Sequence, residues 1–169
     1  KLLKQYQWTT GLKTGSTSKA KYCISATASK DGIDLIAVVM GAPDYKARFG
    51  DAQALLTYGF SVCKLYIDEN QEPLSPLPVE GGVSEEAGIA YQGEFRFLDT
   101  AGSDLEAVEK VLELPEAVQA PVEKGTEAGR ARYMLNGTEI GSTPILYAED
   151  VEKASYPDYL RKIFGFFLL

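Results

Sequence analysis

The segment Gly11-Leu12-Lys13-Thr14-Gly15, followed by Ser16-Thr17 and the strand-like run Tyr22-Cys23-Ile24-Ser25-Ala26-Thr27-Ala28, is the most informative part of this chain. On the edge of a sheet, a Lys-Thr-Gly triplet can hold a carboxylate. The Lys ammonium is a point charge, the Thr hydroxyl is a directional donor, and the Gly lets another backbone lie close to the strand. A bare triplet is a weak signal, since a solvated lysine beside a Thr-Gly turn is more common.

The residues beyond the triplet form a longer pattern that strengthens this interpretation. They include Ala37-Val38-Val39-Met40-Gly41-Ala42-Pro43, Arg48-Phe49, Leu55-Leu56-Thr57-Tyr58-Gly59-Phe60, Pro78-Val79-Glu80-Gly81-Gly82, Ala120-Pro121-Val122-Glu123-Lys124-Gly125 and Leu135-Asn136-Gly137-Thr138-Glu139-Ile140-Gly141. With them, nearly the whole chain resembles the D-alanyl-D-alanine carboxypeptidases, the low-molecular-mass penicillin-binding proteins, whose active sites contain a Lys-Thr-Gly strand. One departure is Lys21, where the family usually has Gly, so the conformation after the motif strand is left open.

The resemblance implies an α+β fold in three parts. Residues 1–60 would be the end of a penicillin-binding, transpeptidase-like domain, in which antiparallel strands and a helix carry the Lys-Thr-Gly motif. Residues 61–155 would form a small antiparallel all-β domain, and residues 156–169 the start of a membrane-associating segment.

The resemblance also implies a function and a set of roles. A serine-type carboxypeptidase of this kind removes the terminal D-alanine of peptidoglycan stem peptides through an acyl-enzyme, which β-lactams trap. Lys13 and Thr14 would bind the terminal carboxylate, Gly15 would permit close approach, and the backbone N–H of Ser16 would help form the oxyanion hole. Arg48 would lie near the substrate carboxylate, although a solvated or salt-bridged surface arginine is an equal alternative.

The expected partners and location follow from the same resemblance. They are the stem peptide, β-lactams and the membrane surface, at the outer face of the bacterial cytoplasmic membrane, with no cofactor and no metal. A rival hypothesis is a non-catalytic module, in which the β-rich residues 61–155 hold a partner or set a distance from the membrane.

The nucleophile of such an enzyme is not evident in these residues. Ser-x-x-Lys occurs at Ser16/Lys19, Ser18/Lys21 and Ser61/Lys64, but the motif needs a serine at the start of a buried helix with the lysine one turn later. The first two pairs are expected in the loop after the motif strand and the third on a strand, where positions i and i+3 face opposite ways. There is no Ser-x-Asn triplet. We therefore expect a C-terminal piece that performs no acyl transfer alone.

Composition excludes several other classes of function. The chain has no histidine, which excludes Ser-His-Asp and Cys-His catalysis and histidine metal sites within these residues. With 24 acidic and 17 basic residues, its net charge of -7 argues against a nucleic-acid partner. We expect Cys23 and Cys63, both in apolar runs, to be small buried core residues rather than a disulfide.

Two strands and a helix are predicted after the triplet. Strands over 22–28 and 33–41 flank an Asp31-Gly32 hairpin turn, and the second strand is apolar on both faces, so each face needs cover. Asp44 is a candidate cap for a helix over 45–58, and Gly59 is placed to end it. If one face of the sheet stays uncovered, we expect the chain to self-associate.

Regular Pro and Gly signals after Phe60 predict the antiparallel β domain, with a type I′ hairpin at Asn136-Gly137. The segment around Ser103-Asp104-Leu105-Glu106 is ambiguous. It looks like a helix capping box, whereas the resemblance favours a strand over 110–114.

The terminal run 159–169 combines a basic pair with an apolar end. It is typical of a membrane-surface anchor or of a helix packed on the β domain.

Overall fold

The computed structural model describes residues 2–167. The chain divides into two compact units, one of residues 1–66 and 98–103 and the other of residues 67–97 and 104–169. Antiparallel sheets with a few helices build both units, which confirms the predicted α+β class.

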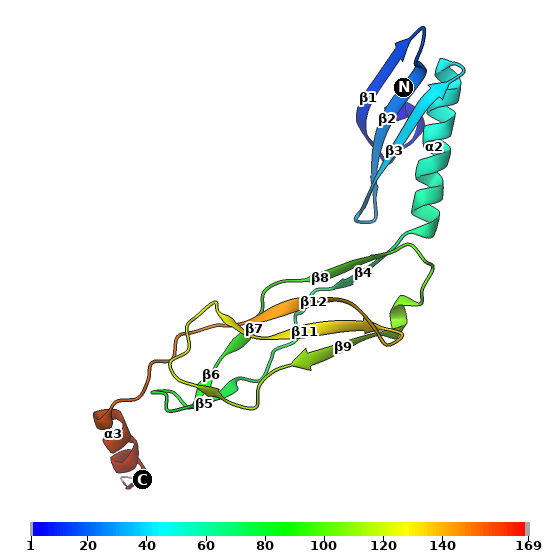
Figure 1. Cartoon of the computed structure of the whole chain (residues 1–169). Coiled ribbons are helices and arrows are strands. Elements are labelled where there is room, and N and C mark those ends of the chain that lie inside the picture. Colours follow the sequence, from blue (N-terminus) through cyan, green and yellow to red (C-terminus); the bar gives the residue numbers. More distant parts are fainter. Residues whose placement is uncertain (1, 168–169) are drawn as a thin grey trace. The chain divides into compact units, whose positions relative to one another are not determined.

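The first unit is a three-stranded antiparallel sheet with two helices (Figure 1). Its elements are α1 (Leu2–Gln5), β1 (Thr9–Thr17), β2 (Lys21–Lys30), β3 (Ile33–Ala42) and α2 (Tyr45–Val62). The strand order is β1-β2-β3, so β1 is an edge strand. Asp31 and Gly32 join β2 to β3 with φ of 52° and 77°, which confirms the predicted hairpin turn.

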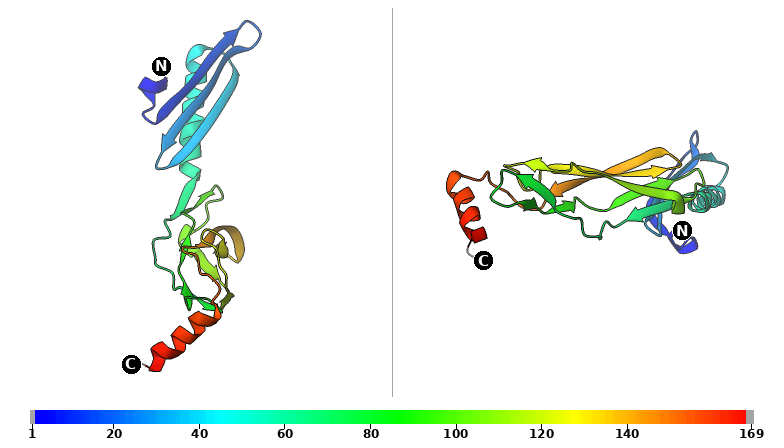
Figure 2. Two further views of the ribbon diagram at one scale, coloured as in Figure 1. Left: turned by 90° about the vertical axis from the view of Figure 1, so that its left-hand side faces the viewer. Right: turned by 90° about the horizontal axis from the view of Figure 1, so that it is seen from below.

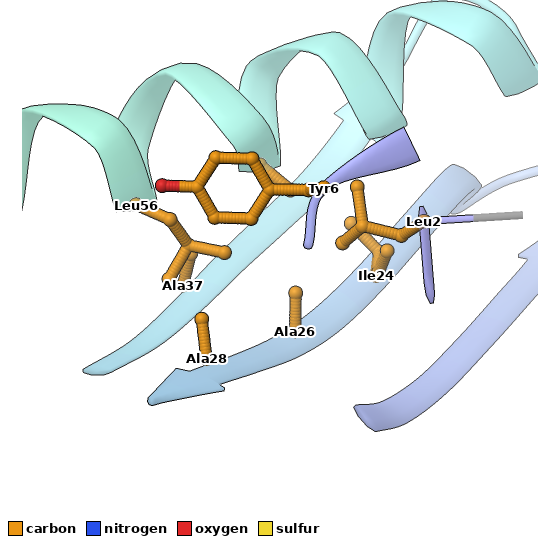
Figure 3. Close-up of a cluster of buried hydrophobic side chains, with 8 residues drawn as sticks. Leu2, Tyr6, Ile24, Ala26, Ala28, Ala37 and Leu56 are labelled. Carbon is orange, nitrogen blue, oxygen red and sulfur yellow. The ribbon is translucent and has the colours of Figure 1, made fainter. Parts of the chain in front are cut away.

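Helix α2 covers one face of this sheet, and the core lies between them (Figures 1 and 2). The buried core consists of Leu2, Tyr6, Ile24, Ala26, Ala28, Ala37, Ala52 and Leu56. The strands contribute mainly alanines, so that Tyr6 and Leu56 can fill the space between sheet and helix (Figure 3). Trp8 packs against this core, with its ring 5.2 Å from that of Tyr6 and 6.3 Å from that of Phe60.

Helix α2 begins where the sequence predicts but ends later. The Asp44 carboxylate accepts hydrogen bonds from the N–H groups of Lys46 and Ala47 at 2.7 and 2.9 Å. These bonds, that of Ala47 foremost, lower the pKa of Asp44. The predicted end at Gly59 is wrong, since Gly59 lies inside the helix. A Cβ there would come within 2.6 Å of a Leu35 methyl group, so the glycine leaves room for that side chain between helix and sheet.

The face of the sheet opposite α2 is apolar and open. Ile36, Val38 and Met40 on β3 are 72%, 59% and 77% exposed. Leu35 and Ala37 on the same strand face α2 instead. The prediction of a strand with two apolar faces is therefore confirmed, and the described residues cover only one of them.

The second unit is built from short strands. An antiparallel sheet in the order β7-β12-β11-β9 is its largest part (Figure 1). Its strands are β7 (Ile89–Tyr91), β12 (Thr138–Tyr147), β11 (Glu127–Leu135) and β9 (Val108–Glu113). A smaller sheet contains β10 (Val118–Gln119), β5 (Leu77–Glu80) and β6 (Glu86–Ala87), with β5 and β10 parallel. Strands β4 (Lys64–Asp68) and β8 (Phe95–Asp99) also pair, and each of them belongs partly to the first unit and partly to the second.

The hairpin between β11 and β12 is confirmed. Asn136 and Gly137 have φ of 51° and 77°, as a type I′ turn requires. Buried Tyr133 on β11 stacks on Phe95 with ring centroids 3.8 Å apart. A Cβ at Gly141 would lie 2.6 Å from the Phe95 ring, so glycine makes room for this stack.

The ambiguous segment forms a strand after a single 3₁₀ turn, η1 (Leu105–Ala107). Asp104 caps that turn, while the Ser103 hydroxyl donates to Asp99 at 3.0 Å. The helix alternative is wrong because the residues after the turn pair with β11 as strand β9. The strand expected from the resemblance is thus confirmed.

Lys110 on β9 lies at the centre of a polar cluster, which we call the Lys110 cluster. Its Nζ contacts Asp68 Oδ2 at 2.8 Å, Asn70 Oδ1 at 3.2 Å, and the Glu72 carboxylate. Tyr133 Oη donates to Asn70 Oδ1 at 2.7 Å. The cluster fastens the segment after β4 to the sheet of the same unit.

Helix α3 (Tyr156–Phe167) follows the last strand. Ser155 precedes it and donates its N–H to Asp158 Oδ2 at 2.8 Å, which closes the first turn. Within residues 2–167, every helix is too short or too polar to cross a membrane. Residues 168–169 of the predicted terminal segment lie outside the described residues.

The two cysteines are free thiols, as predicted. Both are half-buried, so the expectation of full burial in a core is wrong.

Candidate functional site

The Lys-Thr-Gly triplet lies on edge strand β1, which within residues 2–167 pairs with β2 alone. Lys13 is opposite Ser25, Thr14 is opposite Ile24, and Gly15 is opposite Cys23. Opposed residues of antiparallel strands share a face. Because Ile24 belongs to the core under α2, Thr14 faces α2, whereas Lys13 and Gly15 lie on the open face.

Lys13 is exposed, and its Nζ donates to the carbonyl oxygen of Thr14 at 2.7 Å. Among the described residues, none of the ion pairs involves this lysine. Its positive charge is thus not neutralised by a carboxylate of the described chain, as an anion-binding group requires.

Two surface depressions border the triplet, one on each side of the sheet. The depression on the α2 side is lined by Leu2, Leu3, Thr9, Gly11, Leu12, Lys13, Thr14, Ile24 and Phe49. The other includes Lys13, Gly15, Cys23, Ser25, Val38 and Met40. Lys13 and Thr14 line both, so the two predicted carboxylate-binding residues stand where a ligand can approach along the strand edge.

Ser16 lies within β1, opposite Tyr22. The expectation that it falls in a loop is wrong, because the strand continues to Thr17. Ser18 does lie in the turn that follows. Lys21, the first residue of β2, has φ of 52°, a left-handed conformation that a glycine would adopt without strain. A glycine could therefore replace Lys21 without a change of backbone conformation.

None of the three Ser-x-x-Lys pairs has the geometry of a nucleophile motif. Ser16 is on a strand and Ser18 in a turn. Ser61 lies in the last turn of α2, not on a strand as expected, and donates to the Tyr58 carbonyl at 2.7 Å. Lys64 already belongs to β4.

Arg48 lies in the first turn of α2 and is half-buried. Its Nη1 donates to the carbonyl oxygens of Gly15 and Cys23 at 3.2 and 3.3 Å. The guanidinium also lies 5.6 Å from the Tyr22 ring and 5.0 Å from the Phe49 ring. The motif strand is thus tied to α2. These contacts could not be predicted from the sequence, since no residue pattern marks an arginine that binds backbone carbonyls of distant strands.

Two family models match the chain, each along one stretch. Residues 1–44 match the model of the D-alanyl-D-alanine carboxypeptidases, and residues 68–153 match that of the C-terminal domain of penicillin-binding protein 5. Together, the two models place the chain in the class of the penicillin-binding proteins. Within that class, the chain belongs to the D-alanyl-D-alanine carboxypeptidase family.

Relatives agree with this assignment. The chain is 28% identical to the D-alanyl-D-alanine carboxypeptidase DacF of Bacillus subtilis over 98% of its own length and 43% of the relative's. It is 30% identical to DacC of Escherichia coli over 86% of its own length and 37% of the relative's. The chain therefore spans less than half the length of these relatives.

A solved structure shows the same fold. The crystal structure of penicillin binding protein 5 from Haemophilus influenzae matches 90% of this chain and 45% of its own, with 30% identity and a TM-score of 0.69.

Proposed function

We propose that the protein carrying this chain is a serine-type D-alanyl-D-alanine carboxypeptidase that trims peptidoglycan stem peptides. In the proposed reaction a serine oxygen bonds to the penultimate D-alanine carbonyl carbon, and the amide C–N bond breaks. The amine of the terminal D-alanine takes a proton and leaves, and water then hydrolyses the ester. β-Lactams would stop at the ester.

The observation that carries this proposal is the exposed Lys13 ammonium beside Thr14 on the edge strand of the described sheet, in a chain of this family. In the proposal, Lys13 and Thr14 bind the terminal carboxylate, Gly15 permits close backbone approach, and the N–H of Ser16 stabilises the oxyanion. No metal or cofactor is needed for these roles.

The proposal extends to organisation and location. Residues 1–60 would complete the catalytic domain and residues 61–155 would form the β domain. Residues 156–169 would associate with the outer face of the cytoplasmic membrane. The chain alone would perform no acyl transfer, because its Ser-x-x-Lys pairs lack nucleophile geometry.

The first test is the intact mass after incubation with benzylpenicillin. The 169-residue chain should gain no mass. The protein expressed from its complete reading frame should gain one acyl group. A stoichiometric adduct on the chain itself would make one of its own serines the nucleophile. An unmodified complete protein would favour the non-catalytic module.

The second test is Lys13→Ala in the complete protein. Loss of the cation should slow acylation by benzylpenicillin about 100-fold or more, the scale of a lost charge-assisted contact. Lys19→Ala, a lysine in the adjoining turn, is the matched control and should acylate normally. Unchanged kinetics for Lys13→Ala would remove Lys13 from the site.

A further inference from the structure

Arg48 holds one particular peptide group of the motif strand. The Gly15 carbonyl that it binds and the Ser16 N–H belong to the same peptide unit. That unit is trans, because the cis peptide bonds found lie at Gly11-Leu12 and Ala120-Pro121. In a planar trans unit the N–H and the C=O point in opposite directions. The position of the Gly15 oxygen therefore fixes the direction of the Ser16 N–H.

The direction follows from the second carbonyl that Arg48 binds. Gly15 and Cys23 are directly opposed on β1 and β2. Arg48 Nη1 lies 3.2 Å from the Gly15 oxygen and 3.3 Å from the Cys23 oxygen. A single nitrogen can reach both oxygens only if both carbonyls point into the space between the two strands. The N–H of Ser16 consequently points away from β2, to the free edge of β1, where the proposed substrate would lie.

We propose that Arg48 is a positioning residue that orients and polarises the oxyanion-binding N–H of Ser16 through the Gly15 carbonyl. This inference rests on the proposed function. A cation on a carbonyl oxygen withdraws electron density from the amide, so its N–H becomes a stronger donor. The role differs from the direct contact with the substrate carboxylate that the family resemblance implies.

The surroundings of Arg48 suit a fixed tether. Its Nε is buried, without a hydrogen-bond partner within the described residues, so this part of the guanidinium is enclosed by protein and does not extend into solvent. The rings of Tyr22 and Phe49 flank the guanidinium. Asp44 caps the turn that carries it. These contacts hold the side chain against the strands rather than in solvent.

The test separates positioning from carboxylate binding by using two acyl donors with the complete protein. Benzylpenicillin carries a carboxylate, whereas N-acetyl-D-alanine p-nitrophenyl ester does not, yet acylation by both passes through an oxyanion. Arg48→Met should lower kcat for the ester and the acylation rate for the penicillin by a similar factor, about 10- to 100-fold. The KM for the ester should change little. Arg48→Lys, which keeps a cationic donor, should recover part of both rates.

Lys13→Met is the matched control, because the proposed function has it bind the carboxylate. Its loss should be larger for the penicillin than for the ester. The same pattern in Arg48→Met, a larger loss for the penicillin than for the ester, would overturn the inference and assign Arg48 to the carboxylate. Equal rates in Arg48→Met and wild type would also overturn it. A wild-type protein that neither donor acylates would instead refute the proposed function.

A second readout covers the case in which Arg48→Met does not fold. In Arg48→Lys the amide NMR signal of Ser16 should shift more than that of Ser25, a nearby amide outside this peptide unit. An unmoved Ser16 signal would contradict the inference.

Discussion

At the scale of single residues, Lys21 has a backbone conformation that residues other than glycine rarely adopt. Its φ of 52° is left-handed, which costs a non-glycine residue about 1–2 kcal/mol. The family resemblance places a glycine here. The hairpin that carries the motif therefore contains a residue whose side chain disfavours the backbone conformation it has.

Lys21→Gly should consequently stabilise the chain. Relief of the left-handed strain outweighs the greater freedom of glycine in the unfolded state, for a net gain of about 0.5–1 kcal/mol. Thermal unfolding followed by circular dichroism should show a midpoint about 1–4 °C higher. Ala20→Gly, at a neighbour without positive φ, should be destabilising. A lower midpoint for Lys21→Gly would contradict this account.

Residue identity alone predicts the local structure at some positions and not at others. The turn at Asp31-Gly32 was predictable because its chemistry is local. Gly59 was not, because glycine suits both a helix end and a close contact. Only the tertiary approach of Leu35 decides between them. The contacts of Arg48 likewise depend on strands far away in sequence.

At the scale of elements, the Lys110 cluster fastens the segment after β4 onto β9. Lys110→Met would leave the largely buried Asp68 carboxylate without its cation. We expect a loss of about 1–3 kcal/mol in the free energy of unfolding by urea, because breaking a partly buried ion pair leaves a partly buried charge without its partner. Arg130→Met is the control, because its pair with Glu127 is exposed and should contribute little. Equal effects of the two changes would rule out a stabilising cluster.

The same cluster should give stability a defined pH dependence. Burial raises the pKa of Asp68, but the hydrogen bonds from Lys110 and Asn70 outweigh it and lower that pKa. The hydrogen bond from Lys110 also lowers the pKa of Glu72. A carboxylate with a lowered folded pKa stabilises the fold above its unfolded pKa. That contribution is lost as the pH falls through the folded value.

At alkaline pH, the dependence of stability on pH has the opposite sign. Burial lowers the pKa of Lys110, but its bonds to Asp68 and Glu72 outweigh burial and raise it. Its contribution is complete below its unfolded pKa and is lost as the pH rises through the folded value. The stability difference between wild type and Lys110→Met should therefore be level from about pH 5 to 10 and shrink on either side. Urea titrations across this range measure it, and a difference independent of pH beyond both limits would contradict it.

At the scale of the whole molecule, the open apolar face of the first unit should make the 169-residue chain self-associate. Replacing Ile36, Val38 and Met40 together by threonine should lower the association measured by analytical ultracentrifugation at high concentration. The control is Leu55→Thr with Tyr58→Thr, exposed positions on α2 that should have little effect. A wild-type chain that stays monomeric would refute the prediction.

The fold class was predictable from the sequence because short motifs, turn residues and strand alternation all indicate the same family, which the matched models confirm. The parallel pairing of β5 with β10 was not, since strands of two to four residues carry too little periodicity. At the candidate site, sequence placed Lys13, Thr14 and Gly15 on a strand. It gave no means to tell which face each would take.

Trp8 is the only tryptophan in the chain, and it packs against the core of the first unit with Lys30 Nζ 4.7 Å from its ring. Its fluorescence is therefore an optical probe of that unit alone, whereas the far-ultraviolet circular dichroism of the backbone reports on both units. Comparing the two signals during denaturation will show whether the units melt together or one after the other.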